Sequence, residues 1–176
     1  MKLLSHTLYN RQPFVIRAER LRKGEVPCLI RWRQPRDDKG IVELVRTQLV
    51  PISPWQHPRD SRLHYEIARR MRRGATLVVA ETRRSSPFGF LHMEFRGTVL
   101  FIDLLAVDSS RQNKHWGTAL MRRAEQYGRK KGCTTSRIFV DEGNYRALRF
   151  YARLGYTTIR TIDALKVIEV AKPLYN

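Results

Sequence analysis

A stretch suited to binding phosphate runs from Asp103 to Leu120, where an apolar segment passes into a polar loop and the loop into an amphipathic segment. The first turn of a helix presents backbone N–H groups without a partner in the helix and carries a partial positive charge, so it attracts anions. The segment from Arg111 to Lys131 holds one acid, Glu125, and seven basic residues: Arg111, Lys114, Arg122, Arg123, Arg129, Lys130 and Lys131. Spacing and charge alone support a pyrophosphate site and an ordinary connection before a solvated basic helix equally.

The whole chain is strongly basic. It has 34 Lys and Arg residues against 16 Asp and Glu residues, for a net charge of +18. Such an excess favours an acidic partner, such as a phosphate-bearing cofactor, an acidic substrate, RNA or an anionic surface, although a surface that serves only solubility gives the same count. The 176 residues, 42% of them hydrophobic, suit one domain with a real core and exclude a disordered chain.

Motifs for other chemistries are missing from the sequence. There is no GxSxG, HExxH or GxxxxGK[ST] segment. Cys28 and Cys133 are far apart and form no CxxC pair, so we expect neither a disulfide framework nor a zinc site, and no metal. His57, His64 and His92 each stand alone, and we expect them to be structural or surface residues.

Targeting signals are also missing. The N-terminal residues 1–4 turn polar at Ser5, too soon for the core of a signal peptide. No apolar run approaches the roughly 20 residues that span a bilayer. We therefore expect a soluble cytoplasmic protein without membrane contact, as a monomer or a homodimer.

The elements that must position the phosphate-binding stretch follow from periodicity and from turn residues. The sequence predicts a strand over 28–33, helices starting at 37–38 and after 60–61, strands over 75–81, 88–95 and 98–107, a helix over 116–131, a strand over 136–140, a helix over 144–154 and strands over 156–160 and 164–172. Within these, Asp60 and Ser61 are predicted to cap the second helix and Gly74 to close it, while Gly132 and Gly155 follow the later helices.

Three consecutive strands joined by short turns predict an antiparallel meander, and the strand–helix–strand passages predict some parallel pairing. The expected fold is therefore α/β with mixed α+β character: a single domain whose central, mixed, mostly antiparallel sheet is flanked by helices. Residues 27–176 form this domain, and residues 1–26, with a possible strand at 14–16, are expected to be an extension packed on it.

Two blocks of residues give the chain a resemblance to the GNAT superfamily of N-acetyltransferases. In the family's acetyl-CoA-binding segment, an Ala-Val strand end is followed by Gln/Arg-x-x-Gly-x-Gly/Ala and a helix; here Ala106-Val107 precede the segment 112–117. The second family block, Asn-x-x-Ala-x-x-x-Tyr-x-x-x-Gly-Phe/Tyr, is matched in register by Asn144, Ala147, Tyr151, Gly155 and Tyr156. With the order of elements, the resemblance covers residues 28–172.

The resemblance implies direct transfer of an acetyl group from acetyl-CoA to a primary amine within a ternary complex. Backbone N–H groups near Leu105 and Val107 would hold the pantetheine arm and polarise the thioester carbonyl. Tyr151 would protonate the leaving thiolate, since the pKa of a phenol, about 10, is close to that of a thiol, about 8.5; the alternative for Tyr151 is a core aromatic. The residues implied to contact acetyl-CoA are Leu105, Ala106, Val107, Gln112, Asn113, Lys114, His115, Trp116, Gly117, Thr118, Asn144, Ala147 and Tyr151.

The loop departs from the family pattern at two positions. Asn113 and His115 stand where glycines are common, and only Gly117 remains. Glycine allows a positive φ and a close approach of the backbone to phosphate; Asn tolerates that conformation better than most residues, and His somewhat. The departures therefore bear on cofactor affinity rather than on the fold. The His115 side chain either donates a hydrogen bond to phosphate or points into solvent.

The general base is a separate question. Strand alternation puts Asp103 on the same face as Phe101, Leu105 and Val107, and a carboxylate on an apolar face needs a reason. Asp103 either accepts a proton from the substrate ammonium, directly or through water, or pairs with an arginine. The alternative bases are Glu94, Asp141 and Glu142.

The acceptor stays open. The positive charge disfavours cationic acceptors such as polyamines and favours a neutral or acidic one. One alternative is an amine presented on RNA or on a ribosomal protein, which the crowded segment 69–73, with four arginines, would grip through phosphates. Another is a binding module that kept the fold and lost the chemistry.

Overall fold

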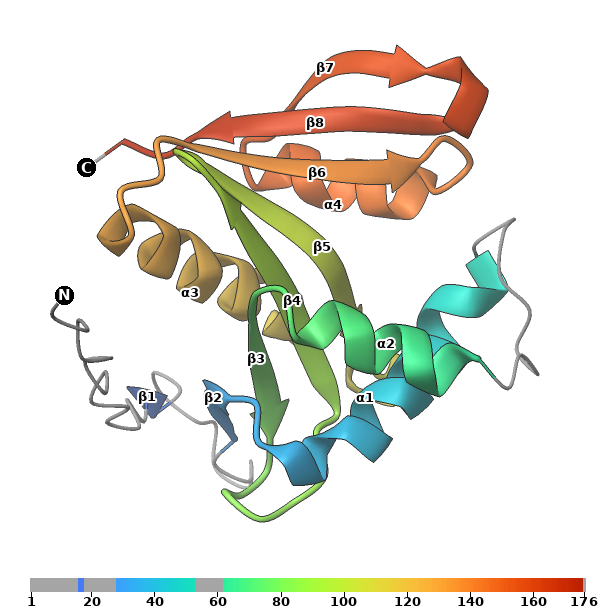
Figure 1. Ribbon diagram of the computed structural model, residues 1–176, viewed down its shortest axis with the longest axis vertical. Coiled ribbons are helices and arrows are strands. Elements are labelled where there is room, and N and C mark those ends of the chain that lie inside the picture. Colours follow the sequence, from blue (N-terminus) through green and yellow to red (C-terminus); the bar gives the residue numbers. More distant parts are fainter. Residues whose placement is uncertain (1–15, 18–27, 53–61, 176) are drawn as a thin grey trace, which may run out of the picture.

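The structure, a computed structural model, describes residues 16–17, 28–52 and 62–175, which form one open sheet with helices on both faces (Figure 1). The predicted caps Asp60 and Ser61, and most of the extension 1–26, lie outside the described residues. None of the helices described is both long and apolar enough to cross a membrane. The strands and main helices are β1 (Ile16–Arg17), β2 (Leu29–Trp32), α1 (Asp38–Leu44), α2 (Leu63–Met71), β3 (Ala75–Ala80), β4 (Gly89–Arg96), β5 (Val99–Val107), α3 (Trp116–Lys130), β6 (Thr135–Asp141), α4 (Tyr145–Arg153), β7 (Thr157–Ile162) and β8 (Val167–Pro173).

The sheet has the strand order β1-β2-β3-β4-β5-β6-β8-β7. Every neighbouring pair is antiparallel except β5 and β6, which are parallel. This confirms the predicted mixed, mostly antiparallel sheet and its β3-β4-β5 meander. Strand β6 runs parallel to β5 because α3, which lies between them in the sequence, returns the chain to the end of the sheet at which β5 begins.

Each face of the sheet has its own hydrophobic cluster. On one face, α3 and α4 pack against the strands through buried residues that include Leu120, Met121, Ala124 and Tyr151. On the other, α1 and α2 cover β3, β4 and β5 through residues that include Ile41, Leu63, Ile67 and Met71, as the spacing of the last three predicts. The described chain places no helix over β6, β8 and β7 on the face opposite α4 (Figure 1).

The predicted role of Gly74 as a helix cap is wrong. Helix α2 ends at Met71, and Gly74 does not have a positive φ. A Cβ atom at Gly74 would lie 2.0 Å from the carbonyl oxygen of Met93, so the glycine is needed where β3 begins beside β4. Gly132 and Gly155, by contrast, have φ values of 82° and 87° after α3 and α4, which confirms their predicted role as helix-ending residues.

A buried ion pair fixes the start of α1 against β2. The Arg31 guanidinium donates two hydrogen bonds to the Asp37 carboxylate, at 2.6 and 2.9 Å, and the backbone N–H of Gln34 donates a third at 2.7 Å. Burial opposes ionisation of Asp37, but the hydrogen bonds from Arg31 and Gln34 outweigh it, and the pKa of the carboxyl is lowered. Asp37 is 1% exposed, so the charge depends on these donors.

We expect Asp37→Asn to lower the free energy of unfolding by about 3–5 kcal/mol at pH 7, because it leaves the Arg31 charge buried without its counter-ion. Since the folded pKa of Asp37 is lowered, its contribution is complete above the unfolded-state value of about 3.9 and is lost as the pH falls through the folded pKa. The difference in free energy of unfolding between the original chain and the variant should therefore shrink in strong acid. Urea unfolding at pH 7 and at lower pH measures both.

The matched control is Glu43→Gln, which removes an exposed pair with Arg46. It should cost no more than about 1 kcal/mol. Equal losses in the two variants would contradict a special role for the buried pair.

Candidate active site

The strands β5 and β6 form a fork. They pair only from Val99 to Ile102, opposite the segment 135–138, and then diverge (Figure 1). The Asp108 N–H donates to the Phe88 carbonyl at 2.8 Å. Because backbone groups alternate along an antiparallel ladder, those of Leu104 and Ala106 also face β4, and those of Leu105 and Val107 face the gap toward β6. The fork thus exposes backbone donors and acceptors of β5 to a ligand.

The loop after β5 folds back onto the strand end. The side-chain amide of Gln112 donates to the Val107 carbonyl at 2.8 Å, and the Asp108 carboxylate accepts from the Ser110 N–H at 3.0 Å. These bonds hold the loop beside the fork. Gln112 is therefore a brace between loop and strand, while Ala106 is buried in the α1–α2 cluster.

The two non-glycine positions of the loop keep a glycine-like backbone. Asn113 and His115 have φ values of 60° and 61°, and the intervening Lys114 does not have a positive φ. His115 lies at the N-cap of α3 and its side chain makes no capping hydrogen bond within the described chain. The first N–H groups of a helix have no partner inside it, so those of segment 116–118 are available to an anion.

Close packing against α4 explains Gly117. A Cβ atom at this position would lie 3.2 Å from Cζ of Phe150, so the glycine lets α3 and α4 approach one another. Beside it, the Trp116 ring packs edge-on to Phe88 with centroids 5.6 Å apart. The start of α3 is therefore held between Phe88, just before β4, and α4.

Helix α4 begins as its sequence predicts. The Asn144 side-chain oxygen accepts a hydrogen bond from the Ala147 N–H at 3.0 Å and caps the helix. Tyr151, about two turns after the Asn144 cap, is buried. Its ring centroid lies 5.1 Å from that of Phe150 and 5.8 Å from that of Tyr156. Burial raises the pKa of the Tyr151 phenol well above its usual value, so the phenol keeps its proton at any physiological pH.

The predicted face of Asp103 is wrong in part. In the register with β4, His92 pairs with Leu104 and Met93 with Ile102, so Asp103 is the extra residue of a β-bulge. The bulge shifts the alternation: Leu105 and Val107 pack with the α3–α4 cluster, whereas Asp103 faces α2. Strict alternation cannot place a residue beyond a bulge, and nothing in the sequence marks this one.

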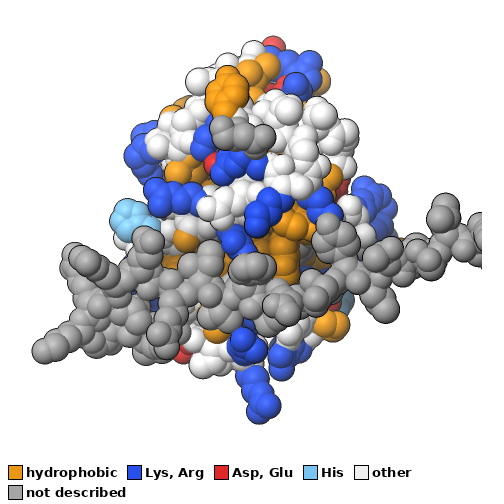
Figure 2. Space-filling model, turned by 90° about the vertical axis from the view of Figure 1, so that its left-hand side faces the viewer, with side chains coloured by type: hydrophobic (Ala, Val, Ile, Leu, Met, Phe, Trp, Pro, Cys, Tyr) orange, Lys and Arg blue, Asp and Glu red, His pale blue; other side chains and the backbone are white. Residues whose placement is uncertain are grey.

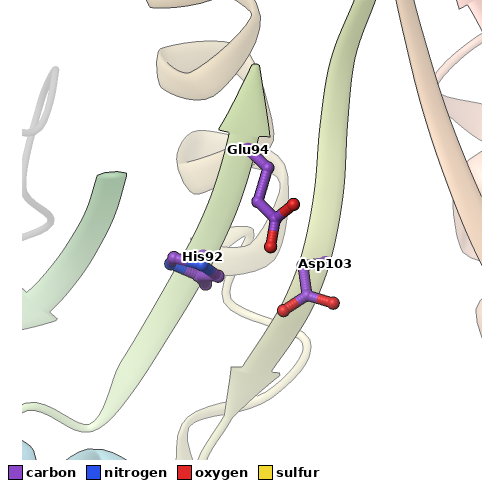
Figure 3. Close-up of side chains that lie close together, drawn as sticks. All are labelled: His92, Glu94 and Asp103. Atoms are coloured by element: carbon purple, nitrogen blue, oxygen red, sulfur yellow. The ribbon is translucent and has the colours of Figure 1, made fainter. Parts of the chain in front are cut away.

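The bulge brings Asp103 next to two side chains of β4. One ligand atom each from His92, Glu94 and Asp103 lies within 4.8 Å of the others (Figure 3). His92 is fully buried and Nδ1 lies 2.9 Å from the Thr76 hydroxyl. Burial lowers the pKa of His92, against the pull of the Asp103 and Glu94 charges, so the ring is neutral at neutral pH.

Arginines border this cluster. Arg70 of α2 lies 3.4 Å from Asp103, and Arg96 donates to Glu94 at 3.0 Å. Both alternatives for Asp103 thus stand together: it has an arginine neighbour, yet its Oδ2 atom is buried without a partner among the described residues. Asp141, another candidate base, lies at the far end of β6 and outside the cluster.

The sequence model of the Acetyltransferase (GNAT) family matches residues 39–156. The chain belongs to the GNAT acetyltransferase family. A stretch of 72 residues is 31% identical to "Uncharacterized protein YxbD" of Bacillus subtilis (strain 168), which is 40% of this chain and 45% of that protein, so less than half of the relative is matched.

Solved structures share the fold at lower identity. The PaiA N-acetyltransferase from Thermoplasma acidophilum, in complex with coenzyme A, superposes with a TM-score of 0.68 at 19% identity, over 83% of this chain and 98% of that one. The ribosomal-protein-S18-alanine N-acetyltransferase from Escherichia coli gives 0.67 at 18%, over 85% and 95%. At these identities the likeness establishes the GNAT fold.

The structure brings most of the predicted residues to one place, and adds one. The β5 end, the loop and the start of α3 line one side of the fork, and Tyr151 belongs to the same hydrophobic cluster as the residues beside it. His92, expected to stand alone, lies beside Glu94 and Asp103. The one available signal was the i, i+2 spacing of His92 and Glu94, which places both on one face of a strand.

The positive φ values give a test of the GNAT loop. A left-handed residue other than glycine costs roughly 1–2 kcal/mol, and glycine loses about 0.5–1 kcal/mol in chain entropy on folding. We expect His115→Gly to raise the free energy of unfolding by roughly 0.5–1 kcal/mol. Asn113→Gly should raise it less, because Asn tolerates this conformation.

Lys114→Gly is the control, since Lys114 lies between them without a positive φ. It should leave stability unchanged or lower it, as measured by urea unfolding. A stabilisation as large as that of His115→Gly would show that the loop is not strained at His115.

Proposed function

We propose that this protein is an N-acetyltransferase that moves an acetyl group from acetyl-CoA to a primary amine by direct attack. The observation that carries the proposal is the fork of β5 and β6, where the Leu105 backbone groups and the Val107 N–H have no strand partner on the β6 side. They lie beside the start of α3, where the His115 side chain makes no capping hydrogen bond within the described chain. The backbone groups of the fork suit the amide-rich pantetheine arm and the thioester, and the start of α3 suits the pyrophosphate.

Three groups of residues would contact successive parts of acetyl-CoA. The N–H groups of segment 116–118 and the exposed Lys114 would hold the pyrophosphate. The backbone of Leu105 and Val107 would hydrogen-bond the pantetheine amides and the carbonyl oxygen of the thioester. Asn144 and Ala147, at the start of α4, would line the opposite side of the fork near the thiol end, close to Tyr151.

Asp103 is the group that we assign to the acceptor. Its unpartnered Oδ2 would take a proton from the ammonium, after which the neutral amine attacks the thioester carbon. The N–H groups of the fork would stabilise the oxyanion, and the C–S bond breaks as the amide forms. Because its pKa is raised, Tyr151 would hydrogen-bond the leaving thiolate through its phenol O–H. The second proton of the attacking nitrogen would reach the thiolate through this hydroxyl, so the amide and the thiol form together and the phenol is restored.

Tyr151→Phe tests this proposal. We expect turnover to fall on the order of ten- to a thousand-fold, because the proton donor is lost while the ring is kept. The dissociation constant for acetyl-CoA, measured by calorimetry, should stay nearly unchanged. Tyr145→Phe is the matched control: Tyr145 is on the same helix but 67% exposed, and its loss should change neither quantity.

Two results would overturn the proposal. A flat calorimetric trace at millimolar acetyl-CoA would rule out the acetyltransferase proposal. Binding of acetyl-CoA without turnover of any amine in a broad panel would leave a GNAT-fold binding module, the alternative that the replaced glycines raise.

A second candidate is an acceptor amine carried on RNA or on the ribosome. The surface beside Asp103 combines aromatic rings with arginines: Phe101 and Phe139 lie 5.2 Å apart, with the Arg96 guanidinium 4.7 Å above the Phe101 ring. Arg137 and Arg160, which both pair with Glu169, continue this surface on β6 and β7. Rings flanked by cations are the features that hold single-stranded nucleic acid.

The net charge of +18 on the chain agrees with this candidate. Figure 2 shows Lys and Arg side chains spread over one face of the molecule, with few acidic side chains between them. The similar fold of the ribosomal-protein-S18-alanine enzyme is consistent with a macromolecular acceptor, although it is similar in fold alone.

Phe139→Ala should therefore weaken binding of single-stranded RNA by roughly 1–3 kcal/mol, or about five- to 150-fold, with acetyl-CoA affinity unchanged. Affinity should also fall steeply between roughly 50 and 200 mM salt. Tyr145→Ala, an exposed aromatic on the opposite face of the sheet, is the control for filter binding. Equal effects of the two variants would reduce RNA binding to nonspecific charge and favour a small-molecule amine.

A further inference from the structure

The cluster of His92, Glu94 and Asp103 has the composition of a metal site. The three side chains come from neighbouring strands (Figure 3). They lie on the face of the sheet toward α2, from which Arg70 contacts Asp103. One imidazole and two carboxylates, with ligand atoms within 4.8 Å of one another, are donors that borderline transition metals accept. Calcium and magnesium prefer oxygen ligands alone, so the imidazole argues against them.

The hydrogen bonds of His92 leave its outer nitrogen free. The Thr76 hydroxyl has one proton and donates it to Sδ of Met71 at 3.1 Å, because a thioether can only accept. In that arrangement Oγ1 of Thr76 accepts from Nδ1–H of His92 at 2.9 Å, which is the tautomer that a metal ion on Nε2 selects. This leaves a lone pair on Nε2, an atom that is buried and has no partner among the described residues.

A lone pair that lies beside two carboxylates is electrostatically unfavourable unless a cation lies between them. In metal sites, the second ring nitrogen of a histidine ligand almost always donates to an outer acceptor that fixes the ring, and the Thr76 hydroxyl occupies that position here. The unpartnered Nε2 is thus an observation independent of the acids, since it depends on Thr76 and Met71.

The neighbouring arginines can leave. The Arg96 side chain is 63% exposed and that of Arg70 is 40% exposed, so both can rotate into solvent. The Arg70 contact with Asp103 is long at 3.4 Å, and the other carboxylate oxygen, Oδ2, has no partner in the described chain. Pairs this exposed contribute little, so a divalent ion displaces them at small cost.

We propose that His92, Glu94 and Asp103 bind a divalent transition-metal ion of the zinc and cobalt class. Three protein ligands leave a fourth position open, as in metal sites that exchange a bound water or substrate. The carboxylates are half-buried, so the ion reaches them from the α2 side of the sheet.

The metal competes with the acceptor amine. This second part rests on the proposed function, in which Asp103 receives the ammonium. An ion bound to Asp103 occupies that carboxylate and repels the ammonium, so zinc is an inhibitor competitive with the amine and does not affect acetyl-CoA binding.

Cobalt titration of the full chain tests the binding directly, without acetyl-CoA or amine. We expect visible d–d absorption that saturates at one equivalent of Co²⁺ and is abolished by Zn²⁺. His92→Gln should remove the absorption. Thr76→Val should weaken binding about 10- to 100-fold, the usual effect of losing an outer-shell partner.

His64→Gln is the matched control, because His64 is an exposed histidine on α2. It should leave the titration unchanged. Circular dichroism identifies any variant that fails to fold, and Asp103→Asn, which changes a half-buried group only, provides a second ligand variant. Binding of Co²⁺ by folded His92→Gln and Asp103→Asn as strong as in the original chain, or an equal loss in His64→Gln, would overturn the proposal.

The two parts can fail separately. Saturable cobalt binding without an increase in the apparent KM for the amine would keep the metal site and overturn the competition. Failure of the acetyltransferase proposal would leave the cobalt titration unaffected.

Discussion

Pairing between β5 and β6 stops after Ile102, and the candidate site depends on that interruption. If β5 and β6 stayed paired beyond Ile102, the backbone groups of Leu105 and Val107 would form hydrogen bonds with β6. Because β6 diverges from β5, those groups have no strand partner on this side. The Val107 carbonyl accepts a hydrogen bond from the Gln112 side chain at 2.8 Å, and the Leu105 backbone groups face the gap. The fork is thus a place where a ligand can hydrogen-bond to the backbone of β5.

The β-bulge at Asp103 separates the two sides of this site. Without it, Asp103 would lie on the same face as Leu105, and the acid would point into the α3–α4 cluster. With it, the backbone beyond the bulge faces the fork while the carboxylate lies with His92 on the α2 side. One extra residue therefore places the proposed thioester side and the proposed acceptor side on different faces of a single strand.

The loop between β5 and α3 keeps the backbone conformation of the family pattern although its residue types differ. Asn113 and His115 replace glycines of the family pattern, yet both have the positive φ that glycine would supply. The geometry is maintained by bonds from elsewhere, such as the one from Gln112 to the Val107 carbonyl. The sequence difference therefore appears as local strain rather than as a different loop.

Local patterns in the sequence determined much of this protein. The meander, the core positions Leu63 and Ile67, the Asn144 cap and the glycines that end α3 and α4 follow from periodicity and from turn chemistry, which depend on residues near in the chain. The GNAT family was likewise readable, because its two blocks are short and contiguous.

Only the tertiary structure decided the contacts that depend on how the strands pair. The reason for Gly74 is a carbonyl of β4, and the site of Asp103 is set by a bulge; both depend on register between strands, which no local pattern records. The same holds for His92. Its neighbours Thr76, Met71 and Asp103 come from three other elements, so whether it is a lone core histidine or a member of a site is fixed only when the sheet and α2 are assembled.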